Sequence, residues 1–128
     1  MTAKETPEQA DDGTEVVNGL YIFEIEMCDG KRGRASGVIV LRDGRIMGGD
    51  SYFYCTGSYS FRNGKWRGEM IVNQHTGAVG KALAFAGREV TCGFSGDYCA
   101  GGAAIEGTAL VGKTSVRFVA RLTLKEAA

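Results

Sequence analysis

The sequence predicts an all-β protein, an up-and-down antiparallel barrel of about eight strands with room for one short helix. Three observations lead to this prediction. The 128 residues include 20 glycines and one proline, and the glycines recur between short apolar stretches. Along several of these stretches apolar and polar residues alternate, as in strands with one buried face. The turns between them are short, so consecutive strands pair antiparallel, and closure removes exposed sheet edges.

The length fits one domain with a single core. Residues 1–18 hold five acidic residues and one basic residue, which gives −4, and the remainder carries +4 because the whole chain is neutral. The first stretch is polar and contains Pro7, so we expect a disordered acidic arm over residues 1–18 and one barrel domain over residues 19–128. A charge of +4 is too small for a surface that neutralises many phosphates, so we expect no nucleic-acid binding.

The strands follow one another at short intervals. In the first, residues 20–27, Glu24 and Glu26 share the face expected to meet solvent, opposite an apolar face. Strands at residues 33–42 and 45–48 flank Asp43-Gly44, and strands at residues 52–61 and 66–72 flank Asn63-Gly64. Both dipeptides favour the positive φ angles of a two-residue type I′ turn.

The last third of the chain is predicted in less detail. Residues 76–85 indicate a loop or one short helix, because glycines weaken the helical pattern. Two strands, residues 88–95 and 103–111, are expected to join around Gly96-Asp97. The final strand, residues 116–124, alternates apolar and polar positions most regularly.

No residues suggest catalysis. His75 is the only histidine, it ends a predicted strand, and the four cysteines match no metal-ligand spacing. We therefore expect a non-enzymatic protein without cofactor or metal, and cysteines that act as small apolar side chains. The sequence shows neither an export signal nor an apolar run long enough to span a membrane, so a cytoplasmic protein with free thiols is expected.

One cluster could serve a binding function. Aromatic residues concentrate in the middle of the chain, and a barrel of eight strands can either be packed solid or hold one small ligand. The sequence leaves both alternatives open, because glycines on the strands can leave empty space inside the barrel or can serve its curvature. If a cavity exists, the candidate lining residues are Tyr52, Tyr54, Tyr59, Phe61, Trp66 and Phe118.

Three segments in fixed order resemble the GrlR family, small bacterial proteins named for a negative regulator of type III secretion. They are NGLY at residues 18–21, SGVIVLRDGRIMGGD at residues 36–50 and YCTGSY at residues 54–59. The turn Gly48-Gly49-Asp50 is short, and it supports the resemblance because it follows the Asp43-Gly44 turn in this order. The resemblance implies a lipocalin-like barrel, a homodimer, and regulation of secretion or transcription through contact with a regulator protein.

The resemblance also implies a partner-contact loop, which is acidic in the founding member of the family. At the matching position this chain has Arg62-Asn63-Gly64-Lys65, a short basic turn. Opposite charge at a contact surface disfavours the same partner. We therefore expect either another partner or another contact surface, and the alternative function is binding of a small apolar ligand inside the barrel.

Overall fold

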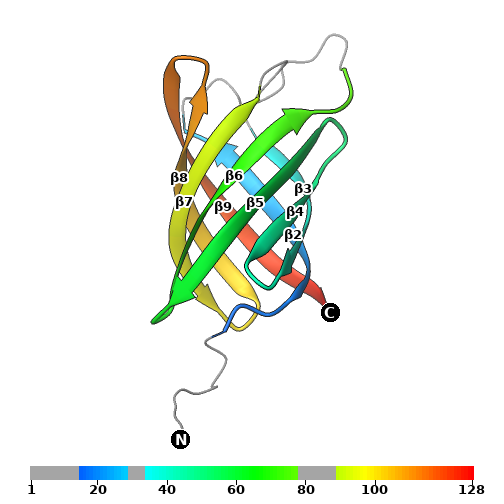
Figure 1. Cartoon of the computed structure of the whole chain (residues 1–128), viewed down its shortest axis with the longest axis vertical. Coiled ribbons are helices and arrows are strands. Elements are labelled where there is room, and N and C mark those ends of the chain that lie inside the picture. The colour runs from blue at the N-terminus through cyan, green and yellow to red at the C-terminus, as the bar shows by residue number, and fades with distance from the viewer. Residues whose placement is uncertain (1–14, 29–33, 78–88) are drawn as a thin grey trace, which may run out of the picture.

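The computed structural model of the protein describes residues 15–28, 34–77 and 89–128, which form eight strands and no helix (Figure 1). Each strand pairs antiparallel with its neighbours in sequence, and β9 pairs with β2, so the sheet closes. The strands are β2 (Gly19–Met27), β3 (Arg34–Arg42), β4 (Arg45–Gly49), β5 (Phe53–Arg62), β6 (Lys65–Gln74), β7 (Val90–Cys99), β8 (Gly102–Val111) and β9 (Thr114–Ala127). The predicted closed eight-stranded barrel is confirmed.

Two of the hairpin turns follow directly from their sequences. Asp43 and Gly44 have φ angles of 49° and 87°, and Asn63 and Gly64 have φ angles of 54° and 78°. Two successive positive φ angles define a type I′ turn, whose twist matches that of the flanking strands. These turns fix the register of β3 with β4 and of β5 with β6.

The turn between β7 and β8 lies elsewhere than predicted. The sequence placed it around Gly96-Asp97, but β7 continues to Cys99 and the turn is formed by Ala100 and Gly101, with φ angles of 50° and 85°. Continuing the strand buries Tyr98, which is 2% exposed. Burial of this aromatic ring outweighs the cost of a positive φ angle at alanine.

Inward and outward positions alternate as the sequence predicts. On β9, Val116, Phe118 and Leu122 are buried and Ala120 is half-buried, whereas the residues that alternate with them are exposed. Glu24 and Glu26 lie on the solvent side of β2. No polar or charged residue of the described ranges is buried, so the core is the apolar interior of the barrel.

Two predictions concern segments at the limits of the described residues: the segment 76–85 and the start of the domain at Gly19. The predicted loop or short helix at residues 76–85 falls almost entirely outside the described residues, as does most of the predicted arm. The residues just before β2 are not an arm, however. Val16 packs against the core, Val17 bonds two core tyrosines, and the Asn18 carbonyl accepts from the Ala128 amide at 2.8 Å. The ordered domain therefore begins before the predicted Gly19.

Residues 16–18 lie across one end of the barrel, which we call the closed end. The Tyr21 hydroxyl has one proton and donates it to the Val17 carbonyl at 2.6 Å, so the Tyr98 hydroxyl must donate to Tyr21 at 2.5 Å. Tyr98 in turn accepts from the Val17 amide at 2.9 Å. This ring of three hydrogen bonds ties the entering chain to the core. Burial, and then the bond from Tyr98, raise the pKa of Tyr21.

Candidate functional site

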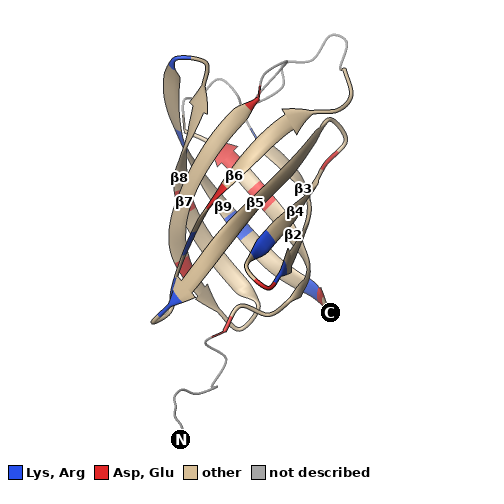
Figure 2. Cartoon of the chain, in the orientation of Figure 1, with Lys and Arg blue, Asp and Glu red and all other residues tan. Residues whose placement is uncertain are grey.

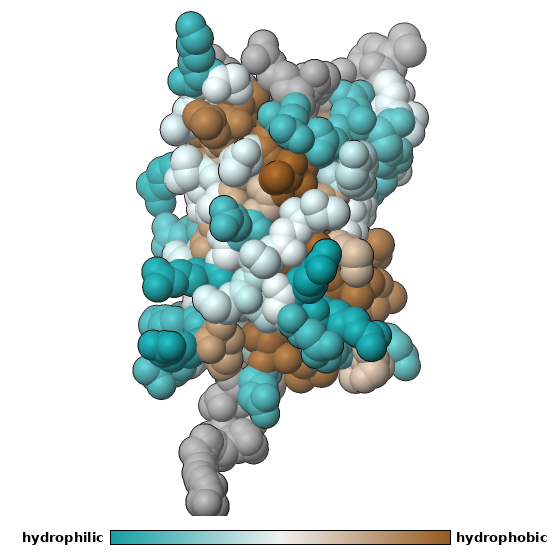
Figure 3. All heavy atoms as spheres, in the orientation of Figure 1, coloured by the Kyte–Doolittle hydropathy of each residue, from teal (hydrophilic) through white to brown (hydrophobic). Residues whose placement is uncertain are grey.

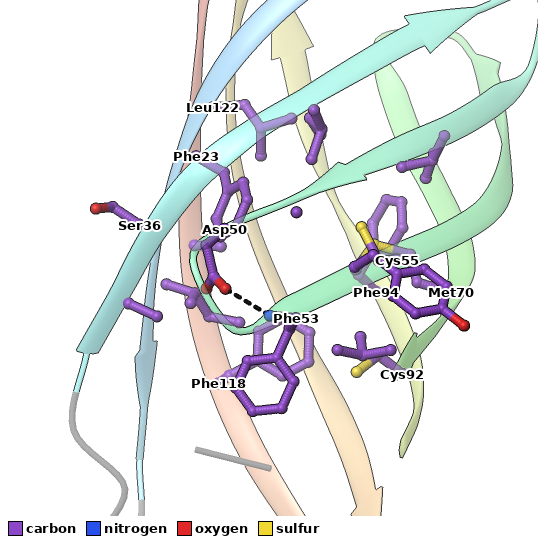
Figure 4. Close-up of a pocket in the computed structure, with 18 of the residues that line it drawn as sticks. Phe23, Ser36, Asp50, Phe53, Cys55, Met70, Cys92, Phe94, Phe118 and Leu122 are labelled. Carbon is purple, nitrogen blue, oxygen red and sulfur yellow. Dashed lines mark hydrogen bonds between the residues drawn. The ribbon is translucent and has the colours of Figure 1, made fainter. Parts of the chain in front are cut away.

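The opposite half of the barrel contains an apolar cavity of about 290 Å³, which we call the interior cavity (Figure 4). Phe53, Phe94 and Phe118 surround the same space from β5, β7 and β9. Other apolar lining residues include Phe23, Ile25, Ile39, Ile46, Met70, Val72, Ile105, Ala120 and Leu122. Their strands alternate regularly, so these side chains face the interior without any special local structure.

The floor of the interior cavity is Trp66, the second residue of β6, next to the Asn63-Gly64 turn. Its ring packs edge-on against Tyr59, Phe94 and Tyr98, with centroid distances of 5.8 Å, 4.8 Å and 6.1 Å. Below it, the Phe61 and Tyr98 rings lie 5.9 Å apart. These large rings fill the closed end, so the cavity stops at the indole.

The mouth of the cavity is built by the turn between β4 and β5. The Asp50 carboxylate accepts from the Tyr52 and Phe53 amides at 2.9 Å and 2.8 Å, and the Asp50 amide donates to the Phe53 carbonyl at 2.9 Å. Gly48 and Gly49 pass close to the adjacent backbone: a Cβ on Gly48 would lie 2.5 Å from Ile39 Cα. The turn Gly48-Gly49-Asp50, which the resemblance singled out, thus stabilises the mouth through hydrogen bonds and close backbone packing.

His75 joins the same region from the end of β6. Its amide donates to the Tyr52 carbonyl at 2.7 Å, and its ring Nε2 donates to the Asp50 carbonyl at 3.0 Å. The ring lies 6.4 Å from that of Tyr54 and is exposed. His75 therefore fastens the β4–β5 turn to β6, and both of its ring nitrogens are occupied because Nδ1 bonds the Thr76 hydroxyl.

Two buried cysteines lie along the wall of the interior cavity. Burial raises the pKa of the Cys92 thiol to about 12, with a smaller contribution from Cys55. Burial and then the Asp50 charge raise the pKa of the Cys55 thiol to about 11. Both stay protonated at neutral pH, and a protonated thiol is a poor nucleophile and metal ligand. They are free thiols, as expected, and so are the exposed Cys28 and Cys99.

The predicted lining residues divide into two groups. Tyr52, Tyr54, Trp66 and Phe118 border the interior cavity, with Tyr54 outward-facing and therefore in contact only at the mouth. Tyr59 and Phe61 do not border it, because their inward positions on β5 fall at the closed end. Phe23, Phe94 and Met70 were missed, although each occupies an inward position of an alternating strand.

The predicted partner-contact loop, Arg62 to Lys65, lies at the closed end, far along β5 from the mouth. Its two basic side chains are exposed, and the Lys65 ammonium bonds the Asp97 carboxylate at 2.7 Å. The Gly64 carbonyl accepts from the Tyr98 amide at 3.3 Å. This loop is a tight, tethered turn with little reach beyond the barrel.

Within the three described ranges, no group of three or more His, Cys, Asp or Glu side chains could hold a metal ion. No helix in those ranges is long and apolar enough to cross a membrane.

Comparison with known proteins adds no relative. No family model matches the chain, and no curated protein matches it significantly. The observations that bear on its function are the geometry of the barrel and the resemblance carried by residues 18–59.

Proposed function

We propose that this protein is a non-enzymatic regulator of the GrlR type, acting through contact with a cytoplasmic regulator protein of secretion or transcription. Two facts support the proposal. The segments that carry the resemblance span residues 18–59, and the barrel implied by that resemblance is the fold of this chain. The single observation that carries the mode of action is an apolar surface on the outside of those same strands.

This surface, which we call the apolar outer face, consists of Leu20, Val38, Met47, Tyr54 and Ile71, each 38% to 46% exposed. They lie on β2 to β6 in continuous register. Leu20 is paired with Val40, Val40 with Met47, Met47 with Thr56, and Thr56 with Ile71. Apolar atoms gather over β3 and β4 at the right of Figure 3. Contiguous exposed apolar surface marks protein contact sites.

The remaining outer surface mixes apolar and charged residues. Leu110 on β8 and Val119 on β9 are 49% and 44% exposed. Cross-strand ion pairs join Arg117 of β9 to Glu106 of β8 at 3.1 Å and Arg34 of β3 to Glu26 of β2 at 3.8 Å. In Figure 2, β5 has no charged residue until the hairpin at its end, where Arg62 lies. Exposed apolar residues are thus scattered on β8 and β9 but grouped on β2 to β6, so the apolar outer face is the surface better suited to desolvation by a partner.

The apolar outer face also offers a contact surface other than the loop that the resemblance implies. The Arg62 to Lys65 turn has the wrong charge and too little reach for an acidic-loop contact. A regulator that binds the apolar outer face does not need that loop. The partner proposed here is a protein with a complementary apolar patch.

A crosslinking experiment in the native host tests this assignment. A photoreactive phenylalanine replaces Met47 on the apolar outer face or, as a matched control, Thr108 on the outer side of β8. We expect a crosslink to a transcriptional or secretion regulator from position 47 only. The crosslink should be lost in Val38→Glu and kept in Thr108→Glu.

Three results would contradict the proposal: equal crosslinking from both positions, no crosslink from position 47, or a crosslink from position 47 only to a second copy of this chain. The last result would assign the apolar outer face to the homodimer that the resemblance implies. Light scattering of the wild type and Val38→Glu identifies that case, because the variant alone would be monomeric.

A second candidate function, binding of a small apolar molecule, is favoured by the interior cavity. Its volume of about 290 Å³ is at the lower end of the range for small-molecule sites, and its wall is almost wholly apolar. Native mass spectrometry of protein purified from its own host should show a retained small molecule. Ala120→Phe, which places a ring in the cavity, should lack it, and identical masses apart from the substitution would exclude this candidate.

A further inference from the structure

We propose that the interior cavity takes a ligand with an apolar body and one neutral hydrogen-bond acceptor at its inner end, to which the indole N–H of Trp66 donates. This inference rests on the second candidate function, ligand binding in the cavity. It names the chemical class of the ligand and the residue that recognises it.

The first observation is the state of the indole nitrogen. Trp66 is 1% exposed, and its Nε1 is the one buried side-chain nitrogen or oxygen without a hydrogen-bond partner in the described ranges. Leaving such a donor unpaired costs roughly 1–3 kcal/mol. Buried polar groups in folded proteins are nearly always paired, so an exception calls for a functional explanation.

The second observation is the place of this residue. The indole is the floor of the interior cavity, so a molecule that fills the cavity ends against it. The Tyr59, Phe94 and Tyr98 rings pack around the indole, and Nε1 itself is buried. An acceptor at the floor of the cavity therefore reaches this N–H when one of the surrounding rings turns aside, and the hydrogen bond that it forms offsets the cost of that movement.

The wall of the cavity limits the acceptor to a neutral one. Its charged residues, Arg34 and Asp50, belong to the mouth, where β3 begins and β4 ends, and the inner wall is apolar. A carboxylate at the floor would be buried without a counter-charge, which is costly. A ketone, aldehyde, ester or ether oxygen satisfies the indole without that penalty. The size of the ligand follows from the volume of about 290 Å³. A water molecule takes about 30 Å³ in the liquid, so the cavity offers the space of roughly ten water molecules and suits a small ligand.

The test uses Trp66 as its own probe, because it is the only tryptophan in the chain. Nonan-2-one and decane, which have the same number of non-hydrogen atoms, are titrated into the ¹⁵N-labelled wild type and into Trp66→Phe. We expect nonan-2-one to shift the single indole proton downfield and decane to leave it in place. Trp66→Phe keeps a ring at the floor and should bind nonan-2-one roughly two- to tenfold more weakly, with decane affinity unchanged.

The outcomes separate this inference from the function on which it rests. If both probes bind, the indole signal stays in place with nonan-2-one, and Trp66→Phe binds both as the wild type does, the indole is not the recognition group although the cavity still binds ligands. If neither probe binds the wild type, ligand binding and this inference both fail. Should Trp66→Phe not fold, the indole shift in the wild type decides alone.

Discussion

The two ends of the barrel share one sheet and the same alternation, yet one is filled and the other is hollow. At the closed end the inward positions carry Tyr21, Tyr59, Phe61, Trp66 and Tyr98, whose rings contact one another. At the opposite end, which we call the open end, the aromatic residues are interspersed with smaller side chains such as Cys55, Cys92 and Ala120, and the interior cavity remains. The difference shows that side-chain volume along the barrel axis, not topology, decides where an eight-stranded barrel is filled and where it leaves a cavity.

The largest effect is expected from removing a ring at the closed end. Tyr98→Ala eliminates contacts with Phe61 and Trp66 as well as the hydrogen-bond ring with Val17. Loss of a large buried aromatic costs about 3–5 kcal/mol of unfolding free energy. Met70→Ala, at the wall of the existing cavity, should cost less than half as much. Urea unfolding measures both, and equal losses would mean that the two ends are packed alike.

The next effect comes from pH. The Cys55 and Cys92 pKa values are raised from 9.0 to about 11 and about 12, so the unfolded chain loses these protons first. Their stabilising contribution is full below pH 9 and declines as the pH rises through this window, by up to about 1.4 kcal/mol per pH unit for each thiol.

Urea unfolding at pH 8 and pH 10 measures this slope, and the Cys55→Ala/Cys92→Ala variant is the control. The variant should lose less stability between the two pH values than the wild type does. An identical slope would show that the thiols at the open end are hydrated rather than buried.

A larger side chain at each end should change the stability by less than the loss of a ring does. The closed end should lose stability, and the open end should tolerate the change. Ala103 lies at the closed end beside Tyr98 in register, and Ala120 lines the interior cavity. Ala103→Leu should destabilise by about 1–3 kcal/mol because the space is already filled. Ala120→Leu should be tolerated and should reduce the affinity for nonan-2-one. Thermal unfolding and a binding titration test the pair, and reversed tolerances would refute the comparison.

The smallest effect concerns the hydrogen-bond ring at the closed end. Tyr21→Phe removes one hydroxyl that bonds the Tyr98 hydroxyl and the Val17 carbonyl. We expect a loss of about 1 kcal/mol and faster hydrogen exchange of the Val17 amide, while Tyr54→Phe on the outside should leave both unchanged. Unaltered exchange in Tyr21→Phe would mean that residues 16–18 are held by other contacts.

Much of the fold could be predicted because its signals are local. Asp43-Gly44 and Asn63-Gly64 specify their turns chemically, and alternation on β2, β6 and β9 specifies which side faces the core. The turn at Ala100-Gly101 could not be found in this way, because alanine carries no preference for a positive φ angle. Its position follows from the burial of Tyr98, a tertiary effect.

The site was less predictable than the strands. The inward direction of Tyr59 and Phe61 could be derived from alternation on β5, but their depth along the barrel depends on the stagger between strands. For the same reason Phe23 on β2 and Phe94 on β7 are brought together without any shared sequence signal. The unpaired nitrogen of Trp66 is likewise a property of its neighbours rather than of the sequence.

The seal at the closed end has a kinetic consequence. Within the described ranges, residues 16–18 and the tyrosine rings close one end of the barrel, so a molecule in the interior cavity would arrive and leave at the other end, past Asp50. By microscopic reversibility, a substitution that only narrows this passage, such as Ser51→Trp, slows both rates by the same factor. Residence time would then change while the equilibrium affinity, which is determined by the cavity wall and floor, stays constant.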